Sequence, residues 1–311
     1  MAKILVTGGA GFIGSHLVDR LIKENHNLVV LDNLSTGKKE FIKKHFKNPC
    51  FKFYKVDLIS DDINKYFKGV DEVWHLAANA DVRAALKDTS KDIQNNIIAT
   101  YKVLEAMRKN GVKKLFFTSS STVYGVSRKI PTPEDHSPLR PISLYGATKL
   151  SCEALISAYS HTFGINGIVF RLANIIGPRS THGVIYDFIK KLKQNTKELK
   201  ILGDGNQKKS YMYIEDCINA FLLVRERVDS DFEVFNVGSE DWVTVKEIAK
   251  IVCNALGVNP VFKFTGGKQG WKGDVPLMLL DISKLKELGF KLKYNSREAV
   301  EKTVDALVNE I

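Results

Sequence analysis

A tyrosine and a lysine stand four residues apart in the stretch ISLYGATKLSCEAL, which begins at Ile142. The stretch contains no proline, and its alanine, leucine and glutamate residues are typical of a helix. Residues four apart share one face of a helix, so the Lys149 ammonium can lie beside the Tyr145 phenol. A free phenol ionises near pH ~10, and a nearby cation in a partly desolvated site favours the phenolate. The spacing therefore predicts a tyrosine base with a lysine partner, although many such pairs are surface contacts worth ~0.5 kcal/mol or less.

A serine at the end of a predicted strand completes the candidate catalytic set. Residues 114–120, KLFFTSS, form an apolar run that ends at Ser120. Ligands of parallel sheets bind at the carboxyl ends of the strands. A hydroxyl there can hydrogen-bond a substrate hydroxyl and steady the alkoxide formed from it. We therefore expect Ser120 to act together with Tyr145 and Lys149.

A glycine-rich turn, TGGAGFIGSH, follows the first predicted strand and opens a helix. Its glycines read as Gly8-x-x-Gly11-x-x-Gly14, and an overlapping pattern begins at Gly9. Glycine permits the tight turn and lets backbone N–H groups approach a pyrophosphate, which the helix amino terminus faces. Asp32 ends the next strand, where a carboxylate accepts from an adenosine ribose and repels a 2′-phosphate. The pattern predicts bound NAD rather than NADP.

Strands alternate with helices through the first half of the chain. Predicted strands lie at residues 3–8, 27–32, 51–57, 72–78, 114–120 and 165–177, and predicted helices at 12–24, 95–109 and from Tyr145 onward. This order predicts an α/β fold of the Rossmann type, a doubly wound parallel sheet. Beyond Gly177 the pattern changes to short strands and helices near residues 185–194 and 245–255. We expect an NAD-binding Rossmann domain at residues 1–175 and a smaller mixed α/β substrate lobe at 176–311, with some elements crossing back to the main sheet.

Composition excludes several classes of protein. The chain is 44% hydrophobic and 26% charged, with a net charge of +11 spread along its length, so we expect a mild attraction for anionic ligands. We find no groove-reading motif for nucleic acid and no apolar run of membrane-spanning length. The first strand has no secretion leader before it, and the four cysteines form no CxxC pair, so we expect a soluble cytoplasmic protein. His136 and His182 lie in predicted loops with no carboxylate or cysteine grouping, so we predict no metal. His75 ends a predicted strand, where a lone histidine is more often a packing residue than a catalytic one.

The motifs together resemble the extended short-chain dehydrogenase/reductase family, and within it the UDP-glucose 4-epimerases of archaeal type. The likeness covers essentially the whole chain, through VTGGAGFIGSHLVD, LDNLSTG, SSSTVYG, PISLYGATK, RLANIIGPR, LGDGNQKKSYMYIEDC and GDVPLMLLDISK. The resemblance implies a two-lobed enzyme with NAD in the amino-terminal domain and a UDP-sugar over the carboxyl-terminal lobe. It also implies a homodimer.

The resemblance assigns roles to individual positions. Ser120 corresponds to the catalytic serine, with Ser121 as the alternative in a shifted register; Tyr145 matches the base and Lys149 its partner. The implied cofactor contacts are Gly8, Gly11, Phe12, Ile13, Asp32, Asn33, Ser35, Thr36, Gly37, Asp57, Leu58, Leu76, Ala77, Ala78, Asn95, Tyr145 and Lys149. The implied substrate contacts are Ser120, Thr122, Tyr145, Asn174, Val184, Lys209, Tyr211, Trp271 and Asp274.

Two positions depart from the family pattern. Lys209 and Trp271 stand where the epimerases generally have arginine. Lys209 keeps the charge but loses the bidentate fork that suits a diphosphate, and Trp271 loses the charge, for which Lys268 or Lys272 can compensate. Asp274 is retained and can accept from a ribose hydroxyl. The identity of the nucleotide is the open part of this prediction.

The implied reaction is inversion of C4 in UDP-glucose or UDP-galactose, as in galactose metabolism, through a 4-keto sugar. A dehydratase would carry an acidic pair after the serine, where this chain has Ser121 and Thr122. Action on UDP-glucuronate, by epimerisation or decarboxylation, or on a UDP-N-acetylhexosamine stays open, although the size of Met278 favours plain hexoses. A non-catalytic NAD-binding sensor is the alternative of another class, and such a protein can dispense with Tyr145 and Lys149.

Overall fold

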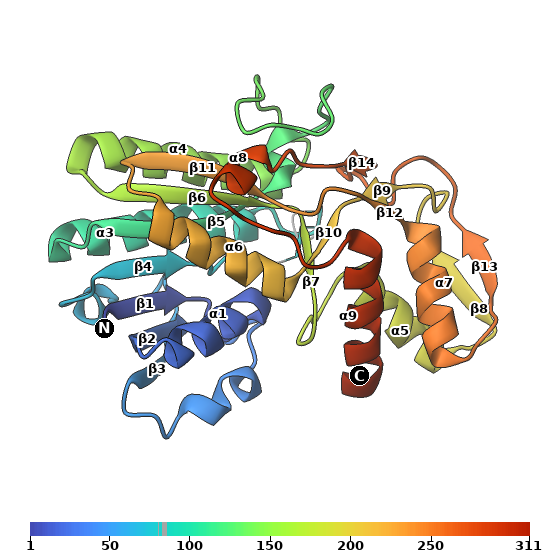
Figure 1. The fold of residues 1–311 in the computed structure, drawn as a ribbon, viewed down its shortest axis with the longest axis horizontal. Coiled ribbons are helices and arrows are strands. Elements are labelled where there is room, and N and C mark those ends of the chain that lie inside the picture. The colour runs from blue at the N-terminus through green and yellow to red at the C-terminus, as the bar shows by residue number, and fades with distance from the viewer. Residues whose placement is uncertain (80, 83–85) are drawn as a thin grey trace. The chain divides into compact units, whose positions relative to one another are not determined.

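A computed structural model describes residues 1–79, 81–82 and 86–311 of the chain (Figure 1). The chain forms two compact units. Unit 1 comprises Met1–Val123, Leu144–Arg171 and Glu226–Phe235, and unit 2 comprises Tyr124–Ser143, Leu172–Arg225 and Asn236–Ile311. The domain boundary expected after residue 175 lies close to the change at residue 172, whereas Tyr124–Ser143, expected in the first domain, packs in unit 2.

Unit 1 is built on a seven-stranded sheet with the order β11-β6-β5-β4-β1-β2-β3. Its strands are β1 (Lys3–Thr7), β2 (Asn27–Asp32), β3 (Phe51–Lys55), β4 (Glu72–His75), β5 (Lys114–Ser120), β6 (Asn166–Leu172) and β11 (Phe232–Val237). β1 pairs in parallel with both β2 and β4, so the order of strands reverses beside β1. The carboxyl ends at such a reversal are where open α/β sheets bind ligands. The prediction of a doubly wound Rossmann sheet is confirmed.

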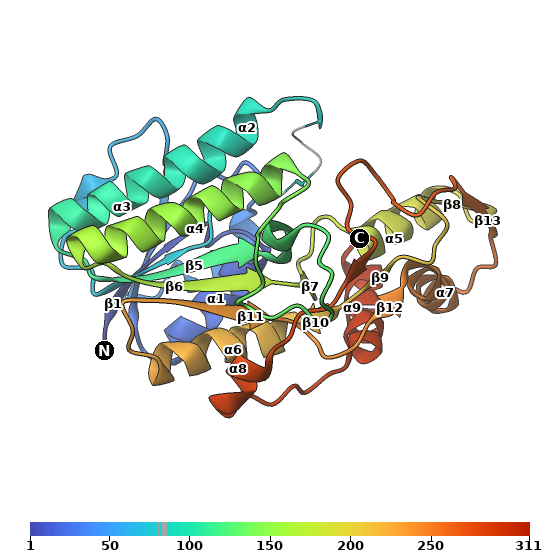
Figure 2. The ribbon, with the colours of Figure 1, turned by 90° about the horizontal axis from the view of Figure 1, so that it is seen from above.

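Helices cover both faces of the sheet in unit 1 (Figure 2). α3 (Ala99–Asn110) and α4 (Leu144–Phe163) lie on one face, and α1 (Phe12–Lys23) lies on the other. Successive strand residues point to opposite faces, so Leu5 joins the apolar cluster under α3 and α4. Within the sheet, the Trp74 ring stacks on Phe116 with centroids 4.3 Å apart. Each fully buried apolar side chain of this size stabilises the fold by about 1.5–3 kcal/mol.

Two elements differ from the sequence prediction. The helix expected at 95–109 starts earlier, with α2 (Ser90–Asp92), and continues through a π-helical segment (Ile93–Ile98) into α3. A π-helical turn contains one more residue than an α-helical turn, and no periodicity marks it in advance. The single strand expected at 165–177 is two strands, because β7 (Asn174–Ile176) pairs with β10 (Tyr211–Tyr213) instead of extending β6.

Unit 2 has its own apolar core, formed by α5 (Val184–Gln194), α7 (Val245–Leu256) and α9 (Ser296–Glu310) with the strands beside them. Thr244 and Glu247 form a capping box that starts α7. The remaining elements are β8 (Glu198–Ile201) with β13 (Val261–Phe264), β9 (Lys208–Lys209) with β12 (Val243–Thr244) and β14 (Leu277–Met278), α6 (Ile214–Arg227) and α8 (Ser283–Glu287). In the described ranges, none of the helices has the length and apolar character that crossing a bilayer requires.

Candidate active site

The glycine-rich turn brings the ends of three strands together. Gly8 has a φ of 71°, and its N–H donates to the Leu31 carbonyl oxygen at 2.8 Å. A Cβ on Gly8 would lie 2.7 Å from the Ala77 nitrogen, and one on Gly14 would overlap the Gly8 carbonyl oxygen. Gly11 precedes α1 and has no side chain to cap the first N–H groups. The turn therefore leaves these donors, and the positive end of the helix dipole, available to an anion.

Asp32 is fixed beside this turn at the end of β2. Its Oδ2 accepts from the Ala10 N–H at 2.9 Å and its Oδ1 from the Leu34 N–H at 2.8 Å. Burial raises the pKa of Asp32, and the hydrogen bonds from Leu34 and Ala10 oppose that rise. Each carboxylate oxygen keeps a further lone pair for an outside donor. Close-packed glycines, a free helix terminus and a buried carboxylate together fit a dinucleotide, and Gly8, Gly11 and Asp32 are the residues that would hold it.

The other predicted cofactor residues lie around the same strand ends. Asn33 Nδ2 donates to Asp57 Oδ2 at 3.1 Å, which joins the loops after β2 and β3. Desolvation acts to raise the pKa of Asp57, but hydrogen bonds from Ile59 and Asn33 leave that pKa lowered. Phe12 and Ile13 begin α1, and Leu76, Ala77 and Ala78 follow β4. Ser35 and Thr36 are exposed, whereas Leu58 is buried. Gly37 lies against the Asp32 carboxylate.

Ser120 ends β5, and its hydroxyl oxygen accepts two hydrogen bonds while its proton has no acceptor among the described residues. The Ser120 Oγ accepts from the Thr122 N–H at 3.2 Å and from the Thr122 hydroxyl at 3.0 Å. Because both bonds use oxygen lone pairs, the Ser120 O–H can donate to a substrate oxygen. Thr122, a predicted substrate contact, therefore positions the serine.

Lys149 joins α4 to the end of β5. Its Nζ donates to the Thr118 carbonyl oxygen at 2.8 Å and lies 5.9 Å from the centroid of the Tyr145 ring. The side chain is 2% exposed, and burial lowers the pKa of Lys149 to about 8. The ammonium thus carries a desolvation cost at neutral pH, which is typical of a functional lysine.

Tyr145 has an environment that differs from the expectation. Burial raises the pKa of its phenol, and the Asp92 carboxylate and Cys152 raise it further. The shift towards neutrality that we expected from Lys149 is therefore not produced by the chain alone, because desolvation disfavours the phenolate. The resting phenol keeps its proton.

One residue beside this helix was missed by the sequence reasoning. Asn96, rather than the predicted Asn95, is buried: its Oδ1 accepts from the Asn79 N–H at 3.0 Å and its Nδ2 donates to Thr148 Oγ1 at 2.8 Å. Asn95 donates to the Lys91 carbonyl oxygen on the outer side. The π-helical segment determines which asparagine points inward, and the cofactor role of Asn95 stays a prediction.

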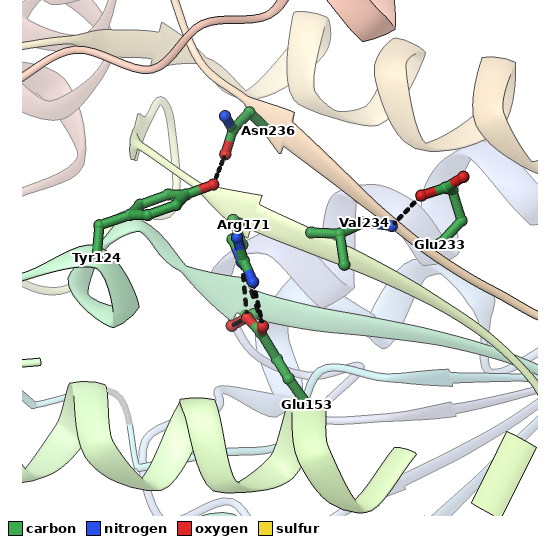
Figure 3. Close-up of polar contacts among 7 residues, drawn as sticks. Tyr124, Glu153, Arg171, Glu233, Val234 and Asn236 are labelled. Carbon is green, nitrogen blue, oxygen red and sulfur yellow. Dashed lines mark hydrogen bonds and ion pairs between the residues drawn. The ribbon is translucent and has the colours of Figure 1, made fainter. Parts of the chain in front are cut away.

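A buried ion pair supports the strand that carries Ser120 (Figure 3). Arg171 Nη2 donates to Glu153 Oε2 at 2.7 Å, and the Ser119 hydroxyl donates to Glu153 Oε1. Glu153 lies one helical turn after Lys149 on the same face of α4, which is the signal that could have indicated it. The pair ties α4, β5 and β6 together next to the catalytic candidates.

The predicted nucleotide-sugar residues lie mostly in unit 2. Lys209 forms an ion pair with Asp274 Oδ1, while Asp274 Oδ2 accepts from the Gly270 N–H at 2.9 Å. Asn174 Nδ2 donates to the Ser210 carbonyl oxygen at 3.0 Å. Tyr211 is buried in β10, Val184 begins α5, and Trp271 is half-buried. Asp274 therefore already has partners on both oxygens, and its expected bond to a ribose would add to these.

His75 has a hydrogen-bond partner at each of its ring nitrogens. His75 is fully buried, its Nδ1 2.7 Å from Thr7 Oγ1 and its Nε2 3.0 Å from Thr100 Oγ1. Burial, with a contribution from Lys149, lowers the pKa of His75 to about 3. It is a neutral packing residue, as its place on a strand predicted. Over the part of the chain that the structure describes, no three His, Cys, Asp or Glu side chains form a metal-binding group.

Residues 4–238 match the model of the NAD dependent epimerase/dehydratase family. The chain belongs to this family. The match spans the glycine turn, Asp32, Ser120, Tyr145 and Lys149. The predictions of a family member with NAD as its cofactor are therefore confirmed.

Relatives of this epimerase/dehydratase family member cover 98–99% of its length. A "Putative UDP-glucose 4-epimerase" of Methanocaldococcus jannaschii is 35% identical over 98% of both chains. A solved UDP-galactose 4-epimerase is 42% identical, with a TM-score of 0.90 and 99% of each chain covered. A UDP-glucuronic acid 4-epimerase from Bacillus cereus, solved with UDP-glucuronic acid and NAD, is 31% identical with a TM-score of 0.90, and covers 99% of this chain and 100% of its own. The family enzyme is thus similar to epimerases of more than one sugar.

Proposed function

We propose that this chain is an NAD-dependent epimerase that inverts C4 of a UDP-hexose, UDP-glucose or UDP-galactose. The observation that carries the proposal is the set Ser120, Tyr145 and Lys149 in unit 1, at the carboxyl end of β5. The serine has a free proton, the phenol keeps its own, and the lysine is desolvated beside it. The similarity to enzymes called UDP-glucose and UDP-galactose 4-epimerase supports the choice of sugar.

The NAD site of the proposal is the glycine turn with Asp32. Bound NAD would supply the acceptor and later the donor of the C4 hydride, together with a positive charge. Asp32 accepts from the ribose, and the first N–H groups of α1 donate to the pyrophosphate. The carboxylate of Asp32 also repels the additional phosphate of NADP.

The chain's own residues move the proton. Tyr145, once it has lost its own proton to solvent beside the positive charge that bound NAD would supply, takes the proton of the sugar 4-hydroxyl and returns it after the ketone has presented its other face, while Ser120 donates to the same oxygen. Lys149 stabilises the ionised phenol through its charge. Because the phenol favours its protonated form in the chain alone, Tyr145 is a strong acceptor once ionised and reprotonates readily.

The residues proposed for the nucleotide are in unit 2: Asn174, Val184, Lys209, Tyr211, Trp271 and Asp274. Lys209 shares its charge with Asp274, so we propose that Lys268 or Lys272 adds charge for the diphosphate. We further propose a homodimer in the cytoplasm, which light scattering and fractionation of the source cells would test.

The experiment that tests the proposal is incubation of purified protein with UDP-galactose, without added cofactor, followed by measurement of UDP-glucose. Tyr145→Phe should lower kcat by about 10²–10⁴-fold, because it removes the proton acceptor. Tyr159→Phe is the matched control: it lies on the same helix, bonds Glu105 at 2.9 Å, and should keep near-normal turnover. Binding of NAD without turnover of any sugar nucleotide, with Tyr145→Phe behaving as the unmodified protein, would favour the non-catalytic sensor instead.

A panel of sugar nucleotides identifies the substrate. UDP-glucuronate and UDP-N-acetylglucosamine are tested beside UDP-galactose for inversion at C4, and UDP-glucuronate also for release of carbon dioxide. If kcat/KM is higher for UDP-glucuronate or UDP-N-acetylglucosamine than for UDP-galactose, that sugar nucleotide replaces UDP-glucose and UDP-galactose in the proposal.

A further inference from the structure

Ser119 is a buried serine that the proposed mechanism does not use. It directly precedes Ser120 in β5, it is 3% exposed, and its hydroxyl donates to Oε1 of Glu153 in α4. The register between β4 and β5 ends at the pair of His75 and Phe117. The last three residues of β5 therefore extend beyond this pairing, and contacts from other elements position them.

Two hydrogen bonds join α4 to this end of β5. Lys149 Nζ donates to the Thr118 carbonyl oxygen at 2.8 Å. One residue later, the Ser119 hydroxyl donates to Glu153. Lys149 and Glu153 are four residues apart and lie on one face of the helix, and Tyr145 lies on the same face one turn earlier. The helix that carries the tyrosine is therefore fixed to the strand immediately before the candidate serine.

The acceptor of the Ser119 hydroxyl is itself held by Arg171 of β6 (Figure 3). Arg171 Nη2 donates to Glu153 Oε2 at 2.7 Å, and Arg171 Nε donates to Glu153 Oε1 at 3.1 Å. Glu153 Oε1 thus receives both the serine hydroxyl and the guanidinium. A buried polar network whose members are all paired is rigid, so the Ser119 hydroxyl is bonded to a fixed point.

We propose that Ser119 is a positioning residue for the proton transfer. Its bond to Glu153 keeps Ser120 and Tyr145 at the separation at which both side chains reach one oxygen of the sugar. This inference rests on the proposed function, in which that oxygen is the one on C4. Without the hydroxyl, the end of β5 can shift against α4, and a misplacement of about 1 Å can cost up to about 100-fold in rate. The residues proposed for the nucleotide lie in unit 2, so we expect a change in kcat rather than in KM.

The test measures kcat and KM for UDP-galactose in variants of Ser119. Ser119→Ala removes the donor, and Ser119→Cys replaces it with a weak donor that still fills the space. We expect both variants to lower kcat about 10- to 100-fold and to keep KM within about twofold. Ser119→Thr keeps the hydroxyl on a side chain that suits a strand, so it should restore kcat to within about threefold. The single-turnover rate at which the sugar reduces bound NAD should fall together with kcat.

Ser160→Ala is the matched control. Ser160 is 4% exposed, lies near the other end of α4, and donates its hydroxyl to the Asp231 carbonyl oxygen at 2.7 Å. Ser119→Ala and Ser160→Ala each lose one buried hydrogen bond, so both should lower the unfolding midpoint by similar amounts. Only the first should lower kcat, because Ser160 is remote from the end of β5.

The outcomes separate this inference from the proposed function. The role of Ser119 is overturned, and the epimerase stands, if Ser119→Ala and Ser119→Cys keep normal kcat, or if Ser160→Ala loses as much kcat as Ser119→Ala. It is also overturned if kcat stays low in Ser119→Thr, or if neither Ser119→Ala nor Ser119→Cys folds, since the hydroxyl would then serve stability. NAD content is measured for each variant, so that loss of cofactor is not mistaken for misplacement. An unmodified protein that turns over no sugar nucleotide overturns the proposed function, and this inference with it.

Discussion

The Lys149 ammonium donates to the Thr118 carbonyl oxygen at 2.8 Å, so a desolvated charge at the site is fixed to the end of strand β5. Burial lowers the pKa of this lysine in the folded protein to about 8, against an ordinary value of 10.5. Between pH 8 and 10.5, Lys149 is mostly protonated in the unfolded chain and mostly neutral in the folded protein. The unfolded chain therefore binds more protons, and the stability of the folded protein rises with pH through this range. The full effect corresponds to about 3 kcal/mol.

We therefore expect the free energy of unfolding in urea to rise between pH 8 and 10.5 more steeply for the unmodified protein than for Lys149→Met. The variant lacks the titrating group. Parallel curves for the two proteins would contradict the buried, desolvated charge described for Lys149.

The low pKa of His75 leads to a prediction for the loss of stability at acid pH. It is buried in its neutral form with a pKa of about 3, whereas a histidine in the unfolded chain titrates near its ordinary value of 6.5. As the pH falls below 6.5 the unfolded chain takes up the proton and stability is lost, by about 1.4 kcal/mol per pH unit at most. His75→Gln should flatten this loss between pH 6.5 and 4.5 in unfolding curves. His161→Gln, an exposed control, should show the same slope as the unmodified protein; equal slopes for all three would refute the assignment.

The glycine turn gives a matched pair of substitutions. Gly8 and Gly111 have almost the same φ, 71° and 70°, but a Cβ on Gly8 meets the Ala77 backbone and a Cβ on Gly111 meets nothing within 4 Å. Gly111→Ala should cost about 1 kcal/mol, the cost of the left-handed conformation alone. Gly8→Ala should cost about 2–4 kcal/mol, because overpacking adds to that strain, and should lower the NAD content of the purified protein. Similar unfolding midpoints for the two variants would show that the close approach is absent.

The buried pair of Glu153 and Arg171 should be expensive to break. Their side chains are 5% and 6% exposed, so Glu153→Gln leaves a desolvated guanidinium without its counter-charge, at a cost of about 3–5 kcal/mol. Glu24→Gln breaks the pair with Arg20, whose side chain is 44% exposed, and should cost less than about 1 kcal/mol. Chemical denaturation of both variants measures the difference. A loss below about 1 kcal/mol in Glu153→Gln would mean that the pair contributes little.

Local patterns were enough to predict the sheet and the position of the candidate site. Alternating apolar runs and helical periods indicated the parallel sheet, and the end of each run indicated where Ser120 and Asp32 lie, because carboxyl ends of parallel strands share one edge. The lysine one turn after Tyr145 follows from helical geometry alone.

Contacts between distant segments could not be predicted in this way. Arg171 meets Glu153 only because β6 runs beside β5 under α4, and no spacing in the sequence encodes that pairing. The charge balance at Tyr145 depends on burial and on Asp92, so the expectation of a lowered pKa considered Lys149 but not the cost of desolvation. The return of Glu226–Phe235 to unit 1 is likewise a matter of tertiary structure.

The wide turn at Ile93–Ile98 makes the number of residues in this segment a structural requirement. Removing a single residue would restore a regular helix and rotate everything before it by about 100° relative to α3. Such a deletion would turn Asp92 away from Asn79, whose Nδ2 donates to its Oδ1, even though every polar side chain was still present. The orientation of Asp92 and Asn96 therefore depends on the number of residues in this segment as well as on the identity of the side chains.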